Sequence, residues 1–305
     1  MNEKKAAAEM IEAVERQMRE MVDAVGYPFA SELFGRLGGG KRLRAKLIMM
    51  IAGATPEAAK LAAVIELIHA ASLLHDDVID EAQLRRGVPS VNATEGSKQA
   101  VMLGDILYSK AFSELTQFDT RIAKVVADAV TSLSVGEMMD VQMAQSFNED
   151  ESLYLRMLYL KTGVLIEAAA VAAALLAGKD PEAHGLYGRN LGVAFQIIDD
   201  ILDIVSDEAT LGKPAMNDYV EGKCTLPYIY LHRALGETDR ERLRSLHGKA
   251  AVSKENEWIK AGMQAHGTIA EAYAHARRLS DEALKAIRGD VALEAVIESM
   301  MQRTF

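Results

Sequence analysis

Cysteine is almost absent from this sequence. Cys224 is the single cysteine among 305 residues, so no disulfide can form within the chain and no metal site can be built from several thiolates. A protein without disulfides is typical of a reducing compartment. We therefore expect a cytoplasmic protein.

Basic residues and long apolar runs are also scarce. The 34 Lys and Arg residues against 44 Asp and Glu residues give a formal net charge of −10. This balance argues against a nucleic-acid partner, because such proteins are usually basic. The N-terminus has no apolar run of the kind found in signal peptides, and the most apolar stretch, residues 168–178, is too short to cross a bilayer. The sequence predicts a soluble protein with no transmembrane segment.

Proline is rare and unevenly placed. There are six prolines, and residues 90–180 and 228–305 contain none. Residues that favour helices are plentiful, whereas few segments alternate with the period of two that is typical of strands. No linker-like stretch and no repeat divides the chain. These features predict an all-α protein with a single large helical domain over residues 1–305.

Two aspartate clusters stand in otherwise apolar, helical segments. They have identical spacing and consist of Asp76, Asp77 and Asp80, and of Asp199, Asp200 and Asp203. The first and last aspartate of each cluster share a helix face, and like charges there destabilise a helix unless a cation neutralises them. One cluster alone would be explained equally well as a solvated acidic face, but two of identical spacing are not. Carboxylates without cysteine favour Mg²⁺, which is usually shared with substrate phosphates. Two clusters that face each other across a cavity therefore suggest a diphosphate held by several Mg²⁺ ions.

Basic residues complement these clusters. Three glycines precede Lys41 and Arg44, which are one helical turn apart, and a helix N-terminus that follows glycines is a ready anion site. Arg85 and Arg86 follow the first cluster, and a planar guanidinium suits phosphate oxygens. Either group alone is also explained as a basic surface patch, but their position beside the acidic helix favours a second, metal-free phosphate site.

Further candidates are lysines in a helix and in a loop. Lys161 and Thr162 lie in a helical stretch, where a lysine is often simply solvated. Lys213 and Lys223 lie in a predicted loop, where they serve either as a lid over phosphates or as plain surface charges.

Several segments, in order along nearly the whole chain, resemble the trans-isoprenyl diphosphate synthases, also called the polyprenyl synthetase family. The similar segments are GGGKRLR, IELIHAASLLHDDVIDEAQLRRGVPSVN, GDILYSKAF, KTG, GVAFQIIDDILD and GKPAMNDYVEGKCTLP. The resemblance implies the isoprenoid synthase fold, which is a helical bundle around a deep central cavity, and a homodimer. It also implies a Mg²⁺-dependent prenyltransferase that joins isopentenyl diphosphate to an allylic diphosphate by 1′-4 elongation.

The resemblance also implies roles for individual residues. Mg²⁺ ions that bridge the allylic diphosphate would be held by Asp76, Asp80 and Asp199, with Asp77, Asp200 and Asp203 in support. The same diphosphate would contact Arg85, Lys161, Lys223 and, as a further candidate, Lys213. Isopentenyl diphosphate would bind Lys41, Arg44, His69 and Arg86, while Thr162 and Gln196 would face the developing carbocation.

Two positions depart from the family pattern. Asp140 stands where the family often has the Gln of GExxQ, and Met216 stands where it often has the second Gly of GKPxGND. Neither departure removes a metal ligand, and the sequence leaves open what the two departures do at the pocket edge and the lid.

Product length depends on bulk near the floor of the cavity. Family members that make short products have aromatic residues one turn before the first aspartate cluster, where this chain has the small residues Ala71 and Ser72. This favours an all-trans product longer than farnesyl, in the hexa- to octaprenyl range. A geranylgeranyl diphosphate synthase stays open, because a bulky residue deeper in the tunnel, such as Met102, Leu103 or Leu107, could also close it.

Two other functions fit these residues less well. A terpene cyclase shares the fold and the first cluster, but it normally lacks a second cluster of this type and needs no isopentenyl diphosphate site. A non-catalytic regulatory subunit of a prenyl synthase complex would be expected to lose aspartates, and both clusters are complete here. A catalytic subunit that needs a small partner remains open.

Overall fold

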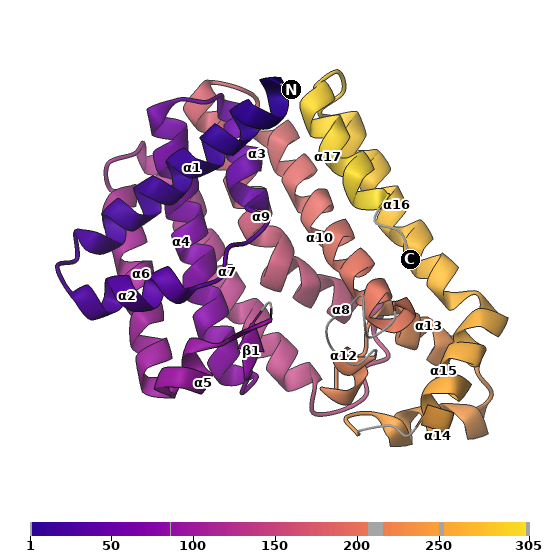
Figure 1. Ribbon diagram of the computed structural model, residues 1–305. Helices are drawn as coiled ribbons and strands as arrows, with labels where there is room; N and C mark the ends of the chain where they lie inside the picture. The colour runs from indigo at the N-terminus through magenta and orange to yellow at the C-terminus, as the bar shows by residue number, and fades with distance from the viewer. Residues whose placement is uncertain (1, 86, 207–215, 250–252, 303–305) are drawn as a thin grey trace. The chain divides into compact units, whose positions relative to one another are not determined.

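The chain folds almost entirely into α-helices (Figure 1). The computed structural model describes residues 2–85, 87–206, 216–249 and 253–302. Within these ranges, extended structure is limited to a pair of two-residue antiparallel strands, β1 (Leu84–Arg85) and β2 (Val88–Pro89). The expected all-α fold class is therefore confirmed.

The helices form two compact units, and each is described by itself. Unit 1 comprises Met1–Val130 and Ala168–His184, and unit 2 comprises Thr131–Glu167 and Gly185–Phe305. The helices that contribute residues to both units are α7 (Thr120–Met143), α9 (Val164–Ala177) and α10 (Pro181–Val205). That residues 1–305 act as a single domain stays a prediction.

Unit 1 is built around one buried helix. This helix is α4 (Pro56–Ile79). The other elements that lie wholly in unit 1 are α1 (Asn2–Asp23), α2 (Pro28–Arg36), α3 (Leu43–Ala52), the β1–β2 pair, α5 (Val91–Glu95) and α6 (Ser97–Leu115). Helix α4 packs most extensively against α6 and also contacts α3 and α1. Residues 61–68 of α4 are all buried, as expected of a helix with neighbours on every side.

The ends of α4 follow from local chemistry. Thr55 caps the N-terminus, where its side chain accepts a hydrogen bond of 3.1 Å from the amide of Ala58, and Pro56 occupies the first turn, where proline has no amide to lose. The helix ends at Ile79, and Asp80 and then Glu81 (φ 50°) leave the helical conformation. The first aspartate motif therefore sits at the C-terminal end of a rigid, buried helix.

Among the residues that the structure describes, two helical segments are long and apolar enough to cross a membrane by length and composition alone. They are α4 and the continuous stretch Glu151–Ala177, and more than half of each apolar window is buried inside the protein. Core helices of globular proteins have the same properties. The absence of a transmembrane segment stays a prediction.

Unit 2 contains the remaining elements. They are α8 (Glu151–Leu158), a π-helical turn η1 (Tyr159–Gly163), α12 (Asn217–Val220), α13 (Leu226–Ala234), α14 (Glu237–Leu246), α15 (Ser253–His266), α16 (Thr268–Ala286) and α17 (Val291–Met301). Helices α16 and α17 run beside α10 (Figure 1). The Tyr187 hydroxyl of α10 donates to the carbonyl of Leu293 in α17 (3.0 Å), and α13 packs against α16 and α15.

Candidate active site

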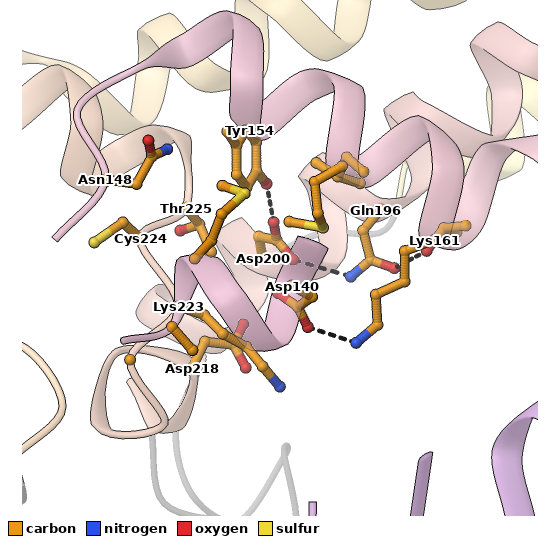
Figure 2. Close-up of a pocket in the computed structure, with 16 residues that line it drawn as sticks. Asp140, Asn148, Tyr154, Lys161, Gln196, Asp200, Asp218, Lys223, Cys224 and Thr225 are labelled. Carbon is orange, nitrogen blue, oxygen red and sulfur yellow. Dashed lines mark hydrogen bonds and ion pairs between the residues drawn. The ribbon is translucent and has the colours of Figure 1, made fainter. Parts of the chain in front are cut away.

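A pocket in unit 2 brings together several residues singled out in the sequence (Figure 2). Its polar lining includes Asp140, Lys161, Thr162, Gln196, Asp200, Asp218 and Lys223, and its apolar lining includes Met143, Ala144, Met157, Leu158 and Cys224. The lining comes from the end of α7, from α8 and η1, from α10 and from the segment around α12. Predicted site residues from three separate segments of the sequence therefore line one cavity.

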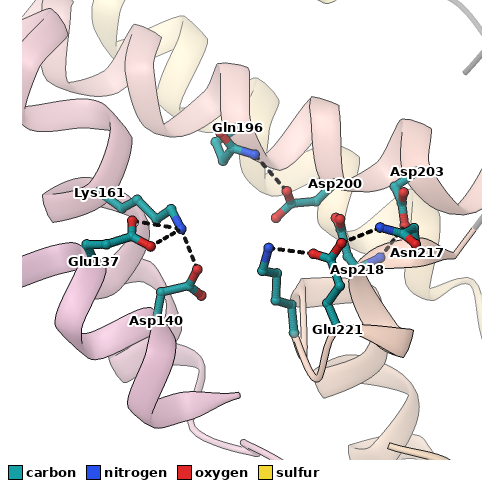
Figure 3. Close-up of polar contacts among 10 residues, drawn as sticks. Glu137, Asp140, Lys161, Gln196, Asp200, Asp203, Asn217, Asp218 and Glu221 are labelled. Atoms are coloured by element: carbon teal, nitrogen blue, oxygen red, sulfur yellow. Dashed lines mark hydrogen bonds and ion pairs between the residues drawn. The ribbon is translucent and has the colours of Figure 1, made fainter. Parts of the chain in front are cut away.

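Lys161 is held between two carboxylates. Gly136 in α7 has no side chain, and a Cβ atom there would lie 2.4 Å from the backbone nitrogen of Lys161, so α7 can approach η1 only because this residue is glycine. The Lys161 ammonium then lies 2.5 Å from an oxygen of Asp140 and 2.9 Å from one of Glu137 (Figure 3). Burial lowers the pKa of Lys161, but the two carboxylates outweigh it and the net pKa is raised, so the lysine is charged at neutral pH.

A second close approach joins η1 to α10. A Cβ atom at Gly192 would lie 2.7 Å from the Cα atom of Gly163. Because both residues are glycine, the two backbones can meet there, and the Thr162 hydroxyl reaches the side-chain oxygen of Gln196, to which it donates over 3.2 Å. The π-helical turn at 159–163 is a local irregularity of a type that is frequent at functional sites.

Asp200 is buried and bonded to side chains on both of its oxygens. Its Oδ2 accepts a hydrogen bond from the hydroxyl of Tyr154, and its Oδ1 accepts one of 2.9 Å from the Gln196 amide. Burial, followed by the nearby charge of Asp218, raises the pKa of the Asp200 carboxyl, and burial together with Asp200 raises that of Tyr154.

Asp203 anchors the segment that follows the second aspartate motif. Its backbone carbonyl accepts from the amide of Met216 (2.8 Å), and its carboxylate accepts from the amide of Asp218 (3.2 Å). The Lys223 ammonium lies 2.7 Å from a carboxylate oxygen of Glu221. The motif therefore fixes the start of α12, and α12 leads to the predicted lid lysine.

Met216, which departs from the family pattern, lies at a backbone position that favours glycine. Its φ is 62° and its ψ is 26°, which is the left-handed region that glycine adopts freely and that costs other residues about 1–2 kcal/mol. Its side chain is buried. Burial of an apolar side chain therefore offsets the backbone strain at this position.

Cys224 is not a reactive thiol. It is buried, and burial raises its pKa to about 12, so the nucleophilic thiolate is scarce at neutral pH.

The first aspartate motif lies in unit 1 and pairs with Arg85. Asp77 is buried, and its Oδ1 accepts hydrogen bonds from Nε (2.7 Å) and Nη2 (2.5 Å) of Arg85. Asp76 is half-buried on α4, and Asp80 is exposed at the helix end. Asp77 thus fixes Arg85, which the resemblance assigns to diphosphate binding. Asp76 and Asp80 lie on either side of Asp77 in the sequence.

The glycine-rich basic segment differs from the expected helix. Helix α3 starts at Leu43, so Lys41 precedes the helix and is not one helical turn from Arg44, which corrects that expectation. The reason is Arg42, whose φ of 50° stops the helix from starting earlier.

A buried carboxylate holds this turn in place. Glu66 of α4 is only 2% exposed. It accepts hydrogen bonds from Arg42 (3.2 Å) and from the amide of Ala45 (3.1 Å), so it satisfies an amide at the helix N-terminus.

The positions expected to control product length are packed. Ala71 is fully buried and Ser72 nearly so, and the Ser72 hydroxyl donates to the carbonyl of His69 (2.9 Å). A tail that passes this position must therefore displace packed neighbours. His69 itself is half-buried.

Two predicted site residues, Arg86 and Lys213, lie outside the described residues. Among the residues that are described, no three His, Cys, Asp or Glu side chains converge to hold a metal ion. The donor types nevertheless fit Mg²⁺, because both motifs offer carboxylate oxygens and this ion keeps water and phosphate ligands beside one or two carboxylates.

Some residues of the site were missed in the sequence. Tyr154, Glu137 and Asp218 in unit 2, and Glu66 in unit 1, are bonded to predicted site residues or beside them. For Tyr154 a signal existed, because it precedes Lys161 by two helical turns and so shares its face. For Glu66 the signal was its position as a single carboxylate within an apolar run of α4.

Known proteins resemble this chain over most of its length. The polyprenyl synthetase family model matches residues 31–263. A short-chain isoprenyl diphosphate synthase from Methanothermobacter thermautotrophicus is 38% identical over 275 residues, which cover 85% of this chain and 84% of that protein.

Two solved structures are similar as well. The crystal structure of octaprenyl pyrophosphate synthase from Helicobacter pylori has a TM-score of 0.93 and 39% identity, and the match covers 97% of this chain and 99% of that one. A polyprenyl synthase from Caulobacter crescentus, complexed with calcium and isoprenyl diphosphate, has a TM-score of 0.86 and 30% identity, with 98% of this chain and 97% of that one covered.

Proposed function

Because the chain belongs to the polyprenyl synthetase family and is thus a prenyltransferase, we propose that it condenses isopentenyl diphosphate with an allylic diphosphate. Repeated 1′-4 addition yields an all-trans polyprenyl diphosphate. The observation that carries the proposal is the pocket of unit 2, where two lysines and the oxygen atoms of Thr162 and Gln196 line one cavity. A substrate that ionises into a carbocation and a diphosphate needs both kinds of group.

The reaction begins when the allylic C–O bond breaks to give a carbocation and pyrophosphate. Lys161, Lys223 and Arg85 bind the pyrophosphate and stabilise its growing negative charge. The double bond of isopentenyl diphosphate attacks the cation, a new C–C bond forms, and the departing pyrophosphate takes the proton that is lost. No separate protein base is required.

The rest of the pocket protects the cation. Thr162 and Gln196 present oxygen atoms, whose partial negative charge stabilises positive charge on carbon. Met143, Met157 and Leu158 line the same cavity, and apolar side chains of this kind exclude water that would quench the cation.

Divalent metal ions are used by the family, and we assign Mg²⁺ here, with several ions for each site. Asp76, Asp80 and Asp199 are the residues that would hold them, as the family resemblance assigns. Asp77 is bonded to Arg85, and Asp200 is bonded to Tyr154. When bound, the ions neutralise charge on the allylic diphosphate.

Isopentenyl diphosphate is assigned to the basic residues of unit 1. Lys41 is exposed, and Arg44 and His69 are half-buried, so each has solvent-accessible atoms. Glu66 holds the turn that presents Lys41 and Arg44. Arg86 completes the set in the proposal.

Product length, assembly and location are also proposals. The small residues Ala71 and Ser72 favour a product longer than farnesyl diphosphate, although the similar proteins include both a short-chain synthase and an octaprenyl synthase. A homodimer in the cytoplasm accords with the family resemblance and with the scarcity of cysteine.

The test is incubation of the purified chain with isopentenyl diphosphate, farnesyl diphosphate and Mg²⁺, followed by chromatography of the products. We expect the purified protein alone to elongate the prenyl product. No elongation, with or without added partner proteins, would contradict the proposal. Asp76→Ala and Asp199→Ala should each abolish turnover, whereas Asp128→Ala, at an exposed position of α7, should not.

A further inference from the structure

A chain of hydrogen bonds starts at the buried Tyr154 and connects four residues that all line the pocket (Figure 2). The Tyr154 hydroxyl donates to Oδ2 of Asp200, the Gln196 amide donates to Oδ1 of Asp200 over 2.9 Å, and the Thr162 hydroxyl donates to Oε1 of Gln196 over 3.2 Å. Tyr154 is 2% exposed and Asp200 is 6% exposed. Both ends of one carboxamide are therefore bonded inside the protein.

The chain fixes which way the Gln196 side chain points. Both Asp200 oxygens accept hydrogen bonds, one from Tyr154 and one from Gln196. Within the Gln196 carboxamide only the NH₂ group can donate, so this group is the end that faces Asp200. The opposite end of the carboxamide, its oxygen, then faces Thr162, and both residues line the pocket. If the carboxamide were flipped, its oxygen would meet the oxygens of Asp200, and the positive end of its dipole would face the pocket.

We infer that Tyr154 and Asp200 are positioning residues that hold the Gln196 oxygen toward the developing carbocation. This inference rests on the proposed function. The Tyr154 hydroxyl ties down one oxygen of Asp200, which leaves the other aimed at Gln196. In a site with little water, a dipole that is oriented before the reaction stabilises charge without reorganising.

The first test is Tyr154→Phe, which keeps the ring and removes the hydroxyl donor. We expect kcat to fall by about tenfold to a hundredfold, with KM for both diphosphates within twofold of the original. The matched control is Tyr230→Phe, because the Tyr230 hydroxyl also donates to a carboxylate in unit 2, that of Glu151 (2.9 Å), but Tyr230 does not line the pocket. Its kcat should stay within twofold.

A double-mutant cycle separates positioning from a general loss of structure. In a Gln196→Ala background, Tyr154→Phe should change kcat by less than twofold, because its effect passes through Gln196. Independent, multiplicative losses would overturn the inference.

Asp200→Asn provides a second variant should Tyr154→Phe fold poorly. We expect a similar loss of kcat, which also vanishes in the Gln196→Ala background, and an unchanged Mg²⁺ concentration for half-maximal activity. A large rise in that concentration would show that Asp200 acts through the metal and would overturn its assignment here.

A measurement that needs no turnover tests the inference separately from the proposed function. The side-chain amide signal of Gln196 can be identified in NMR spectra by its loss in Gln196→Ala. Tyr154→Phe should shift this signal and speed its hydrogen exchange, whereas Tyr230→Phe should do neither. Absence of turnover in the original protein would reject the proposed function, and an unmoved amide signal would reject the inference.

Discussion

Gly136 lies so close to the backbone of Lys161 that a Cβ atom on the glycine would be 2.4 Å from the lysine amide nitrogen. In Gly136→Ala, α7 and η1 must move apart, at a cost of about 1–3 kcal/mol, and Lys161 moves with η1. We expect a lower melting temperature and a several-fold higher KM for the allylic diphosphate. Gly35→Ala in α2 is the control, because nothing lies within 4 Å of its Cβ position. Alanine favours a helix over glycine, so this variant should neither lower the melting temperature nor raise the KM. Equal KM values in the two variants would contradict the prediction.

Asp140 is bonded to Lys161, the lysine proposed to bind the allylic diphosphate. The ammonium lies 2.5 Å from Asp140 and is also bonded to Glu137, so two carboxylates surround one positive charge. Asp140→Asn removes one negative charge beside the proposed diphosphate site, and we expect KM for the allylic diphosphate to fall by up to about tenfold, or about 1.4 kcal/mol. KM for isopentenyl diphosphate should stay constant. The exposed Asp128→Asn on the same helix serves as the control, and a rise in the allylic KM would show that Asp140 instead orients the lysine.

Glu66 supports the basic turn of unit 1 from inside α4. Glu66→Gln removes the charge opposite Arg42 and weakens the bond to the amide of Ala45. We expect a loss of about 1–3 kcal/mol in the free energy of unfolding, measured in urea. KM for isopentenyl diphosphate should rise several-fold, while the allylic KM stays unchanged. Glu57→Gln changes an exposed residue of the same helix and should affect neither quantity; a selective rise in the allylic KM for Glu66→Gln would refute the link.

Glu114 makes unit 1 sensitive to acid. Hydrogen bonds from Lys110 (2.6 Å) and Lys60 (2.8 Å) hold the pKa of the Glu114 carboxyl below its usual range. The stabilisation is therefore complete above the unfolded-state pKa of about 4.3 and is lost as the pH falls through the lower folded-state pKa. Glu114→Gln should lower the melting temperature at pH 7 by about 3 °C, with a difference that shrinks below about pH 4.

The exposed pair of Glu32 with Arg36 offers the comparison for this effect. Glu32→Gln should change the melting temperature by less than about 1 °C at either pH, because exposed ion pairs contribute little. A difference for Glu114→Gln that persists undiminished in acid would show that packing, and not charge, is responsible.

Ala71 tests the product length. A tyrosine at this buried position adds bulk where a growing prenyl tail would have to displace packed neighbours, so Ala71→Tyr should shorten the main product by at least one isoprene unit. Chromatography of the prenyl chain released from the product measures its length. Ala93→Tyr, at an exposed position of α5, is the control, and an identical product distribution in both variants would mean that another residue limits the chain.

The sequence by itself determined the helical class and most of the candidate residues. Proline-free stretches rich in helix-forming residues are local properties, and so is the spacing within each aspartate motif. Lys161, Thr162 and Gln196 were named from such local patterns, and the structure places all three around one pocket.

Only the tertiary structure decided which partner each of these residues has. Asp200 looks like Asp199 in the sequence, yet it is bonded to Tyr154, 46 residues away, and Lys161 is shared by Glu137 and Asp140 because Gly136 lets two helices meet. Hydrogen bonds and close backbone approaches between distant segments depend on how the helices pack, and no local spacing encodes them. For this reason the sequence could name the groups of the site, whereas packing determined which of them are held in place and by what.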